Sequence, residues 1–554
     1  MPIRSFLIAL LLGGLVSSAR ALPPGDSGSA GDVSRTDSLR ELQAGAVRTG
    51  QADWGHWGAD PAKYTQWGQH SNRLIPVYTF GIDLRSVSGD NSLYRDRKRI
   101  EQLYGYLPAG TLNPQADYFD QTDIYRLQQL AAEAGKRRII LFIFDGLDWP
   151  TTRAAAIYRA GEVRYQDGRG SGLHYQDYRG AATDFGYMVT SPYCDGGRVD
   201  ANTQTVDTSA ARRRGGYDFK LGGAAPWSTP ADPQYLISQS RAQPHATTDS
   251  AASATSMTSG IKTYNDAINV DPQGRQVETI AQKLQRQGWA VGAVTSVPLS
   301  HATPACAYAN NVYRDDYQDI ARDMLGLQSV SHRANPLPGM DVVIGTGWGD
   351  NVTTDRSQGD NFVPGNRYAT AADLQLIDVD NGGRYRVVQR AGGVNGSKAL
   401  AAAATDATEN HHRLLGMFGA GLTNHLPFRT ADGRYDPAPG RMKIAERYTP
   451  EDLDENPHLS DIALAALSVL SQNSMGFWLM IEAGDVDWGN HDDNIDNSIG
   501  AILDGDDAFQ AVTDWIEHHG GWQDTVLIVT ADHGHYFHLT KPEVFAEAGR
   551  QSKN

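Results

Sequence analysis

Acidic and imidazole side chains stand shortly after three apolar runs of this 554-residue chain. They are Asp145 after residues 139–144, Glu482 after 477–481, and Asp532 with His533 after 525–529. Continuous apolar runs of this length are typical of strands buried on both faces. Ligands of open α/β sheets bind beyond the carboxyl ends of such strands. We therefore expect these three carboxylates and one imidazole to gather along one edge of a sheet.

A second pair of candidate ligands follows Glu482. Asp487 and His491 are four residues apart and would share one face if a helix begins there. Carboxylate oxygen together with imidazole nitrogen suits zinc, whereas oxygen alone suits magnesium. Taken singly, an Asp after a strand is more often a turn or helix cap, and a lone His is more often a surface or core residue. The shared position of several such residues favours metal binding, because clustered carboxylates repel one another unless cations lie between them.

The segment 245–271 contains a candidate nucleophile. Small residues follow Asp249 and Ser250, and the run is compatible with a helix. Ser250 would then lie near a helix N-terminus, where backbone N–H groups and the helix dipole stabilise an alkoxide or a phosphoryl group. The alternative is a small-residue helix packed against the sheet with Ser250 merely as its cap, and composition alone favours that alternative.

The elements that must position these residues alternate between strands and helices. Apolar runs predict strands at 139–144, 289–294, 342–344, 477–481 and 525–529, and helical patterns lie at 278–287, 460–471 and 507–518. Such alternation is typical of a mostly parallel sheet covered on both faces. We therefore expect a three-layer α/β/α sandwich around a mostly parallel sheet.

Five stretches of the chain, in order, resemble the alkaline phosphatase family. The longest runs from Asp249 through Thr255 and Gly260 to Asn265, and it is similar to the family's nucleophile segment. The others are Phe144-Asp145-Gly146, His301-Ala302-Thr303-Pro304 with Arg314 downstream, the segment from Glu482 to His491, and Thr530-Ala531-Asp532-His533-Gly534-His535. The resemblance covers about 135–345 and 455–540.

The resemblance implies a role for each matching residue. Ser250 would be the nucleophile that forms a covalent phosphoserine, Arg314 would grip two phosphate oxygens, and Asp249 would orient Arg314. The implied ligands are Asp145, Asp532 and His533 for one zinc ion, Asp487 and His491 for a second, and Asp145, Thr303 and Glu482 for a magnesium ion. His535 would lie behind the ligands and orient Asp487.

The chain departs from the family pattern at three points. The second zinc ion of the family takes a further histidine from a segment well beyond the Thr-Ala-Asp-His motif, but only a short stretch follows His533. Either the chain is truncated, or another histidine substitutes; the candidates are His538, His411, His412, His425 and His458. His301 and Trp488 stand at positions that vary within the family, near the magnesium ion and the phosphate. The family's C-terminal elements are absent, so a homodimer is possible but not assured.

The N-terminus has the pattern of a secretory signal peptide. Arg4 precedes an apolar stretch at 6–16, and Ala19-Arg20-Ala21 is a cleavage signature. We expect export to the periplasm or the extracellular space, and no membrane span. The net charge of −16 argues against general nucleic-acid binding. Two cysteines, Cys194 and Cys306, permit one disulfide bond, which the sequence alone does not establish.

These observations divide the chain into four parts. We expect a signal peptide at 1–21, a flexible leader and N-terminal extension at 22–135, a catalytic domain at 136–545 with insertions at about 160–240 and 350–455, and a tail at 546–554. The expected activity is zinc- and magnesium-dependent hydrolysis of small-molecule phosphate monoesters with release of inorganic phosphate. The alternatives are a phosphodiesterase or another hydrolase of the same superfamily, and a catalytically impaired phosphate- or metal-binding protein.

Overall fold

A ten-stranded sheet forms the centre of the computed structural model, which describes residues 37–209, 212–237, 245–421 and 424–553. The strand order is β12-β13-β9-β8-β14-β4-β15-β2-β5-β3, and every neighbouring pair is parallel except the two pairs made by β2. The expected signal peptide lies outside the described residues. The described chain therefore has the mostly parallel sheet that the alternation of strands and helices predicts.

The central strands coincide with the predicted apolar runs. They are β4 (Arg138–Phe144), β8 (Ala290–Pro298), β9 (Val342–Thr346), β14 (Phe477–Ala483) and β15 (Thr525–Thr530). The outer strands are β2 (Ile75–Phe80), β3 (Phe119–Asp120), β5 (Thr183–Val189), β12 (Tyr385–Gln389) and β13 (Arg413–Phe418). β14 and β15 are buried at every position and β4 at all but its first, because each lies between two neighbours and under helices on both faces.

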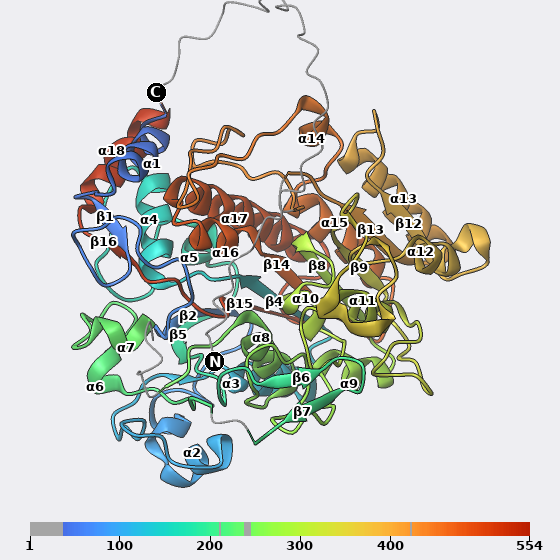
Figure 1. The fold of residues 1–554 in the computed structure, drawn as a ribbon, viewed down its shortest axis with the longest axis horizontal. Coiled ribbons are helices and arrows are strands. Elements are labelled where there is room, and N and C mark those ends of the chain that lie inside the picture. The colour runs from blue at the N-terminus through green and yellow to red at the C-terminus, as the bar shows by residue number, and fades with distance from the viewer. Residues whose placement is uncertain (1–36, 210–211, 238–244, 422–423, 554) are drawn as a thin grey trace, which may run out of the picture. The chain divides into compact units, whose positions relative to one another are not determined.

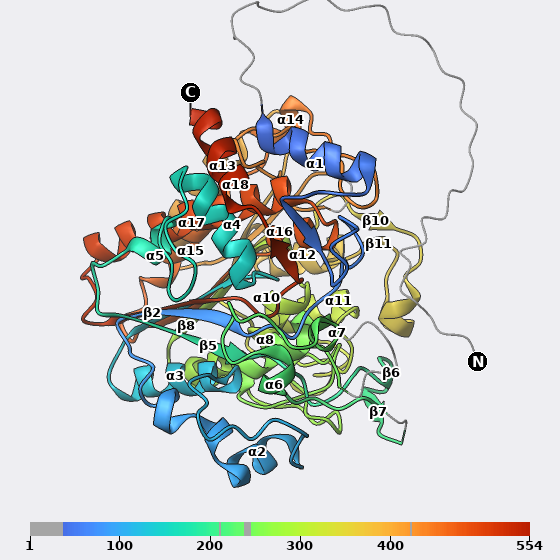
Figure 2. The same cartoon turned by 90° about the vertical axis from the view of Figure 1, so that its left-hand side faces the viewer.

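Helices cover the sheet on both faces, so the expected three-layer α/β/α architecture is confirmed (Figure 1 and Figure 2). One layer contains α4 (Trp149–Ala160), α13 (Gly396–Asn410), α15 (Leu459–Leu470) and α17 (Ile495–His518). The opposite layer contains α3 (Thr122–Glu133), α8 (Ser250–Ser259) and α9 (Ile280–Arg286). The predicted helices at 278–287 and 460–471 agree with the bounds of α9 and α15 to within about two residues. Helix α17 begins earlier than predicted, at Ile495, because Asn494 caps it by accepting a hydrogen bond from the Asn497 N–H at 3.2 Å.

The remaining elements are short or lie outside the sheet. The helices are α1 (Ser38–Thr49), α2 (Arg97–Tyr104), α5 (His174–Asp177), α6 (Phe219–Gly222), α7 (Pro233–Ile237), α10 (Ala302–Cys306), α11 (Tyr317–Leu325), α12 (Ala371–Ile377), α14 (Pro450–Asp454), α16 (Asp485–His491) and α18 (Pro542–Lys553). The paired short strands are β1 (Gly55–Trp57) with β16 (Phe537–Leu539), β6 (Arg198–Asp200) with β7 (Thr205–Asp207), and β10 (Asn351–Val352) with β11 (Gly365–Asn366).

The structure corrects the expected division of the chain. The N-terminal extension supplies β2 and β3 to the central sheet, and the two segments expected to be insertions supply β5, β12 and β13. The sequence obscures three of these strands, β2, β5 and β12, for physical reasons. Pro76 has no N–H to donate and argues against a central strand, and β5 and β12 are only partly buried.

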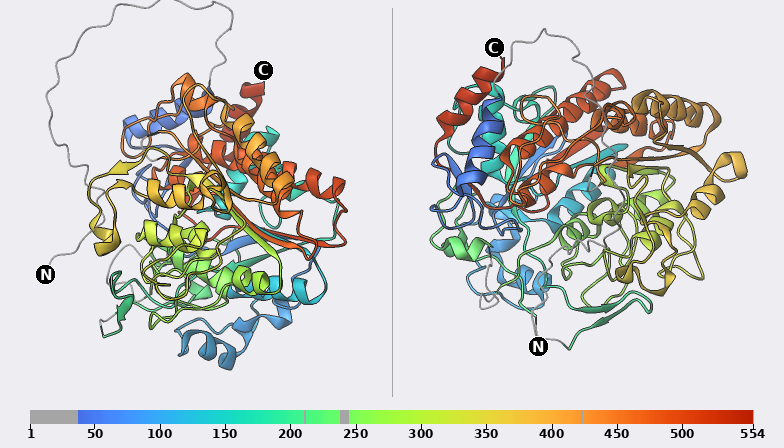
Figure 3. Two further views of the ribbon diagram at one scale, coloured as in Figure 1. Left: turned by 90° about the vertical axis from the view of Figure 1, so that its right-hand side faces the viewer. Right: turned by 45° about the horizontal axis from the view of Figure 1, so that its top comes forward.

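Both ends of the described chain are folded as well. Residues 38–49 of the expected flexible leader form α1, and the expected tail at 546–554 belongs to α18 as far as Lys553. The two helices lie side by side (Figure 1 and Figure 3). Cys194 and Cys306 are both buried and unbridged. None of the described helices is long and apolar enough to cross a membrane.

The direction of β2 matters for the site. It runs antiparallel to β15, with Val77 opposite Thr530 and Phe80 opposite Leu527. The residues that precede β2 therefore lie at the same sheet edge as the residues that follow the parallel strands. Ser71 accordingly forms a bridge with Gly534, and its N–H donates to the Gly534 carbonyl at 2.6 Å.

Candidate metal centre and active site

The candidate nucleophile lies at the N-terminus of a buried helix. Asp249 caps α8 by accepting a hydrogen bond from the Ala252 N–H at 2.9 Å, and Ser250 is the first helical residue. The Ser250 hydroxyl lies 3.1 Å from Nε2 of His533, which comes from the segment after β15. The structure thus brings the nucleophile segment to the sheet edge that carries the candidate ligands.

Asp145, Asp532 and His533 form a group that could hold a metal ion, which we call the sheet-edge group. The His533 Nε2 atom lies 3.4 Å from a carboxylate oxygen of Asp145 and 3.4 Å from one of Asp532. Asp532 Oδ1 accepts hydrogen bonds from the N–H groups of Gly146 and His533, whereas its Oδ2 and the Oδ1 of Asp145 are buried without a hydrogen-bond partner. Burial and the neighbouring carboxylates hold the pKa of Asp145 well above its ordinary value. A cation would supply the missing partner for these oxygens.

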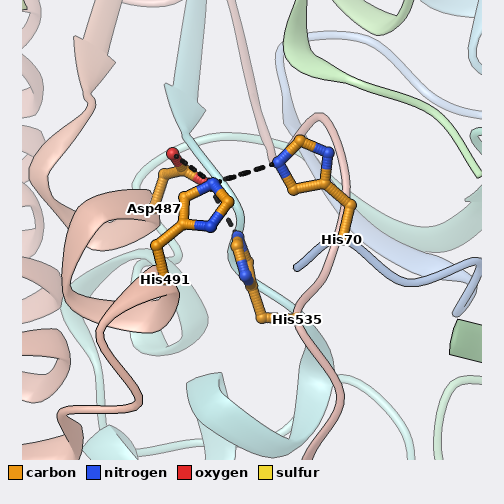
Figure 4. Close-up of side chains that lie close together, drawn as sticks. All are labelled: His70, Asp487, His491 and His535. Atoms are coloured by element: carbon orange, nitrogen blue, oxygen red, sulfur yellow. Dashed lines mark hydrogen bonds and ion pairs between the residues drawn. The ribbon is translucent and has the colours of Figure 1, made fainter. Parts of the chain in front are cut away.

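A second group that could hold a metal ion consists of His70, Asp487, His491 and His535, which we call the bridging group (Figure 4). The Nε2 atoms of His70 and His491 lie 3.2 Å apart. His491 Nε2 lies 3.4 Å from Asp487 Oδ2, and His535 Nε2 lies 2.6 Å from Asp487 Oδ1. Asp487 and His491 share one face of α16, as their spacing predicts.

Hydrogen bonds aim the ring nitrogens of the bridging group inward. Nδ1 of His70 donates to the Thr248 carbonyl at 2.9 Å, and Nδ1 of His491 donates to the Gly68 carbonyl at 2.6 Å. Both Nε2 atoms are therefore left with lone pairs. Burial lowers the pKa of each histidine, so both rings are neutral near pH 7. Two lone pairs facing one another at this distance are expected where a cation lies between them.

The segment before β2 delivers His70 to this site. Three consecutive residues after His70 attach this segment to its surroundings. The Ser71 N–H donates to the Gly534 carbonyl, and Asn72 Nδ2 donates to the Ala246 carbonyl at 3.2 Å. Arg73 Nη1 donates to the Phe537 carbonyl at 2.7 Å. The close passage past α16 requires glycine at position 68. A Cβ atom there would lie 2.5 Å from the His491 carbonyl oxygen.

Helix α1 contacts the chain that leads to His70, through Gln43 and Tyr64. The buried Gln43 amide donates to the carbonyls of Pro439 and Asp493 and accepts from the Ile495 N–H and the Tyr64 hydroxyl. These contacts join the N-terminal segment to the turn between α16 and α17, directly after His491. The N-terminal extension is therefore part of the site's framework.

The third expected ligand set, Asp145, Thr303 and Glu482, also comes together. The Thr303 hydroxyl donates to Asp145 Oδ2 at 3.3 Å. Thr295 donates its hydroxyl to Glu482 Oε2, whereas Glu482 Oε1 is buried without a partner. Burial raises the pKa of Glu482 to about 7. An all-oxygen donor set of this kind fits a hard divalent cation such as magnesium.

Arg314 lies next to the nucleophile helix. Its Nη1 donates to Asp249 Oδ2 at 2.9 Å, and its Nη2 lies 3.5 Å from His301 Nε2. The His301 ring meets Trp488 edge-on with centroids 6.0 Å apart. Burial and the nearby Arg314 lower the pKa of His301 to about 3. His301 belongs to neither metal-binding group, and the structure places it instead beside Arg314.

The histidine candidates for the missing ligand fall elsewhere. His538 lies in β16 and meets His56 of β1 with ring centroids 5.0 Å apart. Among the described residues, the two metal-binding groups contain none of His538, His411, His412, His425 and His458. Sequence reasoning missed His70, which comes from the opposite end of the chain. The available signal was a Gly-Gln-His step ahead of the apolar run 74–80.

Comparison with known proteins agrees with the motifs. The sequence profile of the alkaline phosphatase family matches residues 218–549. Alkaline phosphatase 4 of Bacillus subtilis is 27% identical over 307 residues, which are 55% of this chain and 50% of that protein. Alkaline phosphatase of Escherichia coli is 29% identical over 335 residues, which are 58% of this chain and 65% of that protein. A crystal structure of Thermus thermophilus alkaline phosphatase aligns over 72% of this chain and 60% of its own with 22% identity and a TM-score of 0.43.

The extent of these matches defines what they establish. The chain spans half to two thirds of the length of these two curated relatives. His70 lies outside the region that the family profile covers. The profile nevertheless matches more than half of the chain, including the nucleophile segment, Arg314 and the motifs after β14 and β15. The chain belongs to the alkaline phosphatase family.

Proposed function

We propose that this protein hydrolyses phosphate monoesters with Ser250 as the nucleophile. One observation carries the proposal. Ser250 lies at a helix N-terminus within 3.1 Å of His533, and its neighbour Asp249 holds Arg314 at 2.9 Å. A nucleophile, an anion-binding helix end and a guanidinium fork therefore converge beside a cluster of candidate metal ligands.

The donor sets fit two zinc ions and one magnesium ion. Asp145, Asp532 and His533 would hold one zinc ion; His70, Asp487 and His491 would hold the other; and Asp145, Thr303 and Glu482 would hold magnesium. Three protein ligands with an open position are what a catalytic zinc site requires. His535 would orient Asp487 through its 2.6 Å hydrogen bond. When bound, the zinc ions would lower the pKa of the Ser250 hydroxyl and stabilise charge on the leaving oxygen.

The protein's own residues would then act in two displacements. Ser250 Oγ attacks the phosphorus atom and forms an O–P bond, while the bond from phosphorus to the alcohol oxygen breaks and the alcohol leaves with a proton. A water molecule next attacks the phosphoserine, which restores the serine hydroxyl and releases inorganic phosphate. Arg314 would hold two phosphate oxygens in a fork, and Asp249 would keep that fork oriented.

The same geometry bears on the alternatives. A monoester carries one more negative charge than a diester, and a guanidinium fork next to cations suits that extra charge. The binding-protein alternative depended on a missing zinc ligand, and His70 offers one. Because the metals and Arg314 would contact only the phosphate, we expect hydrolysis of many small phosphate esters with little regard for the alcohol. Export by way of residues 1–21 and assembly as a homodimer stay predictions.

Hydrolysis of p-nitrophenyl phosphate at alkaline pH tests this proposal directly. The full chain loaded with zinc and magnesium should hydrolyse the monoester, lose activity on treatment with a chelator, and cleave bis-(p-nitrophenyl) phosphate far more slowly. Ser250→Ala should lower kcat at least about a thousandfold and abolish the acid-stable phosphoenzyme, because it removes the oxygen that would carry the phosphoryl group.

Ser468→Ala, which removes a hydroxyl in α15 that donates to the Ala465 carbonyl at a position outside the segments of the candidate ligands, serves as the matched control. Wild-type rates in Ser250→Ala would reject the nucleophile assignment. Faster cleavage of the diester than of the monoester would instead support the phosphodiesterase alternative.

A further inference from the structure

The nucleophile helix α8 is held in place by hydroxyl groups of its own side chains. Every residue of α8 is buried, and serine recurs at every third position from Ser250 to Ser259. Buried hydroxyl groups need hydrogen-bond partners, and a helix of small side chains has few large groups that lock its rotation. The partners of these hydroxyls therefore determine how α8 is turned about its axis, and with it where Ser250 points.

Ser253 ties α8 to the segment that carries the candidate ligands after β15. It lies about one turn after Ser250. Its hydroxyl is 2.6 Å from the Asp532 carbonyl oxygen and 2.9 Å from Oε1 of Gln121, and it shares its single proton between these two acceptors. Asp532 is followed by His533, whose Nε2 lies 3.1 Å from the Ser250 hydroxyl. The Ser253 hydroxyl thus joins the nucleophile helix to the backbone of the residues that Ser250 faces.

The amide of Gln121 spans two serines of α8. Its Oε1 accepts from Ser253, and its Nε2 donates to Ser256 Oγ at 3.0 Å. Ser256 in turn donates to the Ala252 carbonyl at 2.9 Å. All three of these side chains are fully buried, so no solvent water replaces a partner that is removed. A planar amide that engages both hydroxyls opposes rotation of the helix in either direction.

Gln121 is free to reach α8 because it does not cap its own helix. It occupies the position that precedes α3, but its side chain makes no capping hydrogen bond. The Asp120 carboxylate accepts from the Thr122 N–H at 2.9 Å instead. The Gln121 N–H donates to the Val189 carbonyl of β5 at 3.0 Å, which fixes the residue to the central sheet. Gln121 lies in the N-terminal extension, outside the residues that the family profile matches.

A second glutamine of α3 also contacts α8, and the two helices pack against each other (Figure 1). Gln128 Nε2 donates to the Met257 carbonyl at 2.9 Å, and its Oε1 accepts from Trp478 Nε1 at 2.7 Å. Gln128 is as fully buried as Gln121. It contacts the end of α8 that is distant from Ser250. The two glutamines therefore link the same pair of helices, but only Gln121 acts on the turn that follows the nucleophile.

We propose that Gln121 is a positioning residue for the nucleophile, because its amide sets the rotation of α8 and thereby the place of the Ser250 hydroxyl. The proposal rests on the proposed function, since it takes Ser250 as the nucleophile. A reacting atom that is misplaced by about 1 Å costs on the order of 100-fold in rate. Arg314 comes from a different segment, so phosphate binding should depend on Gln121 less than phosphoryl transfer does.

Gln121→Met in the full chain loaded with zinc and magnesium tests the proposal. Methionine has nearly the length and volume of glutamine but neither the donor nor the acceptor. We expect kcat for p-nitrophenyl phosphate to fall about 10- to 100-fold. Zinc content should stay at the wild-type level, and the inhibition constant of inorganic phosphate should stay within about threefold of it. The equilibrium fraction of acid-stable phosphoenzyme formed from inorganic phosphate should also fall, because only the covalent state needs the placed oxygen.

Gln128→Met is the matched control, because it makes the same substitution between the same two helices. It should lower the melting temperature about as much as Gln121→Met does but keep kcat within about twofold of wild type. Ser253→Ala should lower kcat to an extent similar to Gln121→Met. The double variant should lose less than the product of the two single effects, because both changes break one contact.

Three outcomes overturn the proposal. They are a folded Gln121→Met protein with wild-type kcat, an equal loss of kcat in Gln128→Met, and a loss of zinc from Gln121→Met in proportion to its loss of kcat. If Gln121→Met fails to fold, Ser256→Ala takes its place, since it removes one of the two contacts of the amide. Its kcat should fall about 2- to 5-fold with phosphate inhibition unchanged, and wild-type kcat would overturn the proposal.

Ser250→Ala distinguishes this inference from the proposed function. If the wild type hydrolyses monoesters and Ser250→Ala forms no phosphoenzyme, the proposed function stands whatever Gln121→Met does. If Ser250→Ala keeps the wild-type rate, the proposed function fails first, and the role of Gln121 fails with it.

Discussion

The two metal-binding groups differ in how the chain builds them. The sheet-edge group takes its residues from the segments that follow two neighbouring parallel strands, β4 and β15. The bridging group joins α16 to a histidine more than four hundred residues earlier in the chain. The carboxyl ends of parallel strands always lie at a common edge of the sheet. His70 precedes β2 and reaches that edge only because β2 runs antiparallel to β15. Sequence motifs therefore suffice to predict the sheet-edge group, whereas the bridging group can be identified only when the tertiary fold is known.

The electrostatics of the two groups differ in the same way. Burial and nearby carboxylates raise the pKa of Asp145 in the sheet-edge group. In the bridging group, burial alone would raise the pKa of Asp487, but the surrounding imidazoles outweigh it and hold that pKa well below its ordinary value. The sheet-edge group therefore depends on a cation for charge balance. The bridging group depends more than the sheet-edge group does on the correct packing of the N-terminal segment that carries His70.

Destabilising the N-terminal region should release the metal of the bridging group more readily than that of the sheet-edge group. Lys262, in the loop after α8, pairs with Asp120 at 2.9 Å, and both side chains are fully buried. Lys262→Met removes the only cation paired with Asp120 among the described residues, although Tyr94 and Thr122 still donate hydrogen bonds to its carboxylate. We therefore expect the free energy of unfolding to fall by about 3 kcal/mol. We also expect zinc to be lost from the bridging group before the sheet-edge group, as measured by metal content during dialysis.

An exposed lysine of the same region provides the control. Lys63 is 66% exposed and pairs with Asp60 only at 3.8 Å, so Lys63→Met should change stability by less than about 0.5 kcal/mol. Equal loss of both metals from Lys262→Met would contradict the proposed difference between the groups.

A smaller and pH-dependent effect should come from the neighbouring Asp123. Burial raises the pKa of Asp123 to about 7, and its Oδ2 accepts from the Asp120 N–H at 3.1 Å. A raised carboxyl pKa gives stability that is complete below the unfolded pKa of about 3.9 and is lost as pH rises through 7. Asp123→Asn does not titrate. From pH 5 to pH 8, the free energy of unfolding of Asp123→Asn should therefore rise by about 2–3 kcal/mol relative to that of the wild type.

Denaturant unfolding at the two pH values measures this gain. Asp117→Asn, at a side chain that is 69% exposed, should show no such gain. A constant difference between Asp123→Asn and wild type across the pH range would show that Asp123 is ionised throughout in the folded protein.

The sequence predicts the middle of this molecule better than its edges. The five apolar runs correspond to the five central strands because a strand buried on both faces must be apolar throughout. The structure brings together Ser250, at the start of α8, and the candidate ligands that follow β4, β14 and β15, because each lies at the end of a predicted element. Arg314 joins them through Asp249, the residue that caps α8. Three of the outer strands, β2, β5 and β12, lack that pattern. β2 carries Pro76, and β12 at the sheet edge is only partly buried, so neither has a continuous apolar signature.

His70 escaped prediction for a related reason. A single histidine ahead of a proline-containing strand has no spacing to other ligands, and only the antiparallel pairing of β2 with β15 places it. Local motifs thus identify residues that share one segment, whereas residues supplied by distant segments require the fold.

Metal content and activity of His70→Ala test the central claim most directly. We expect the wild type to hold about two zinc ions per chain and His70→Ala to hold about one, with kcat/KM for p-nitrophenyl phosphate at least about 100-fold lower. His538→Ala, which removes an imidazole outside both groups, should keep the wild-type zinc content and rate. A His70→Ala protein with two zinc ions and wild-type activity would contradict the account.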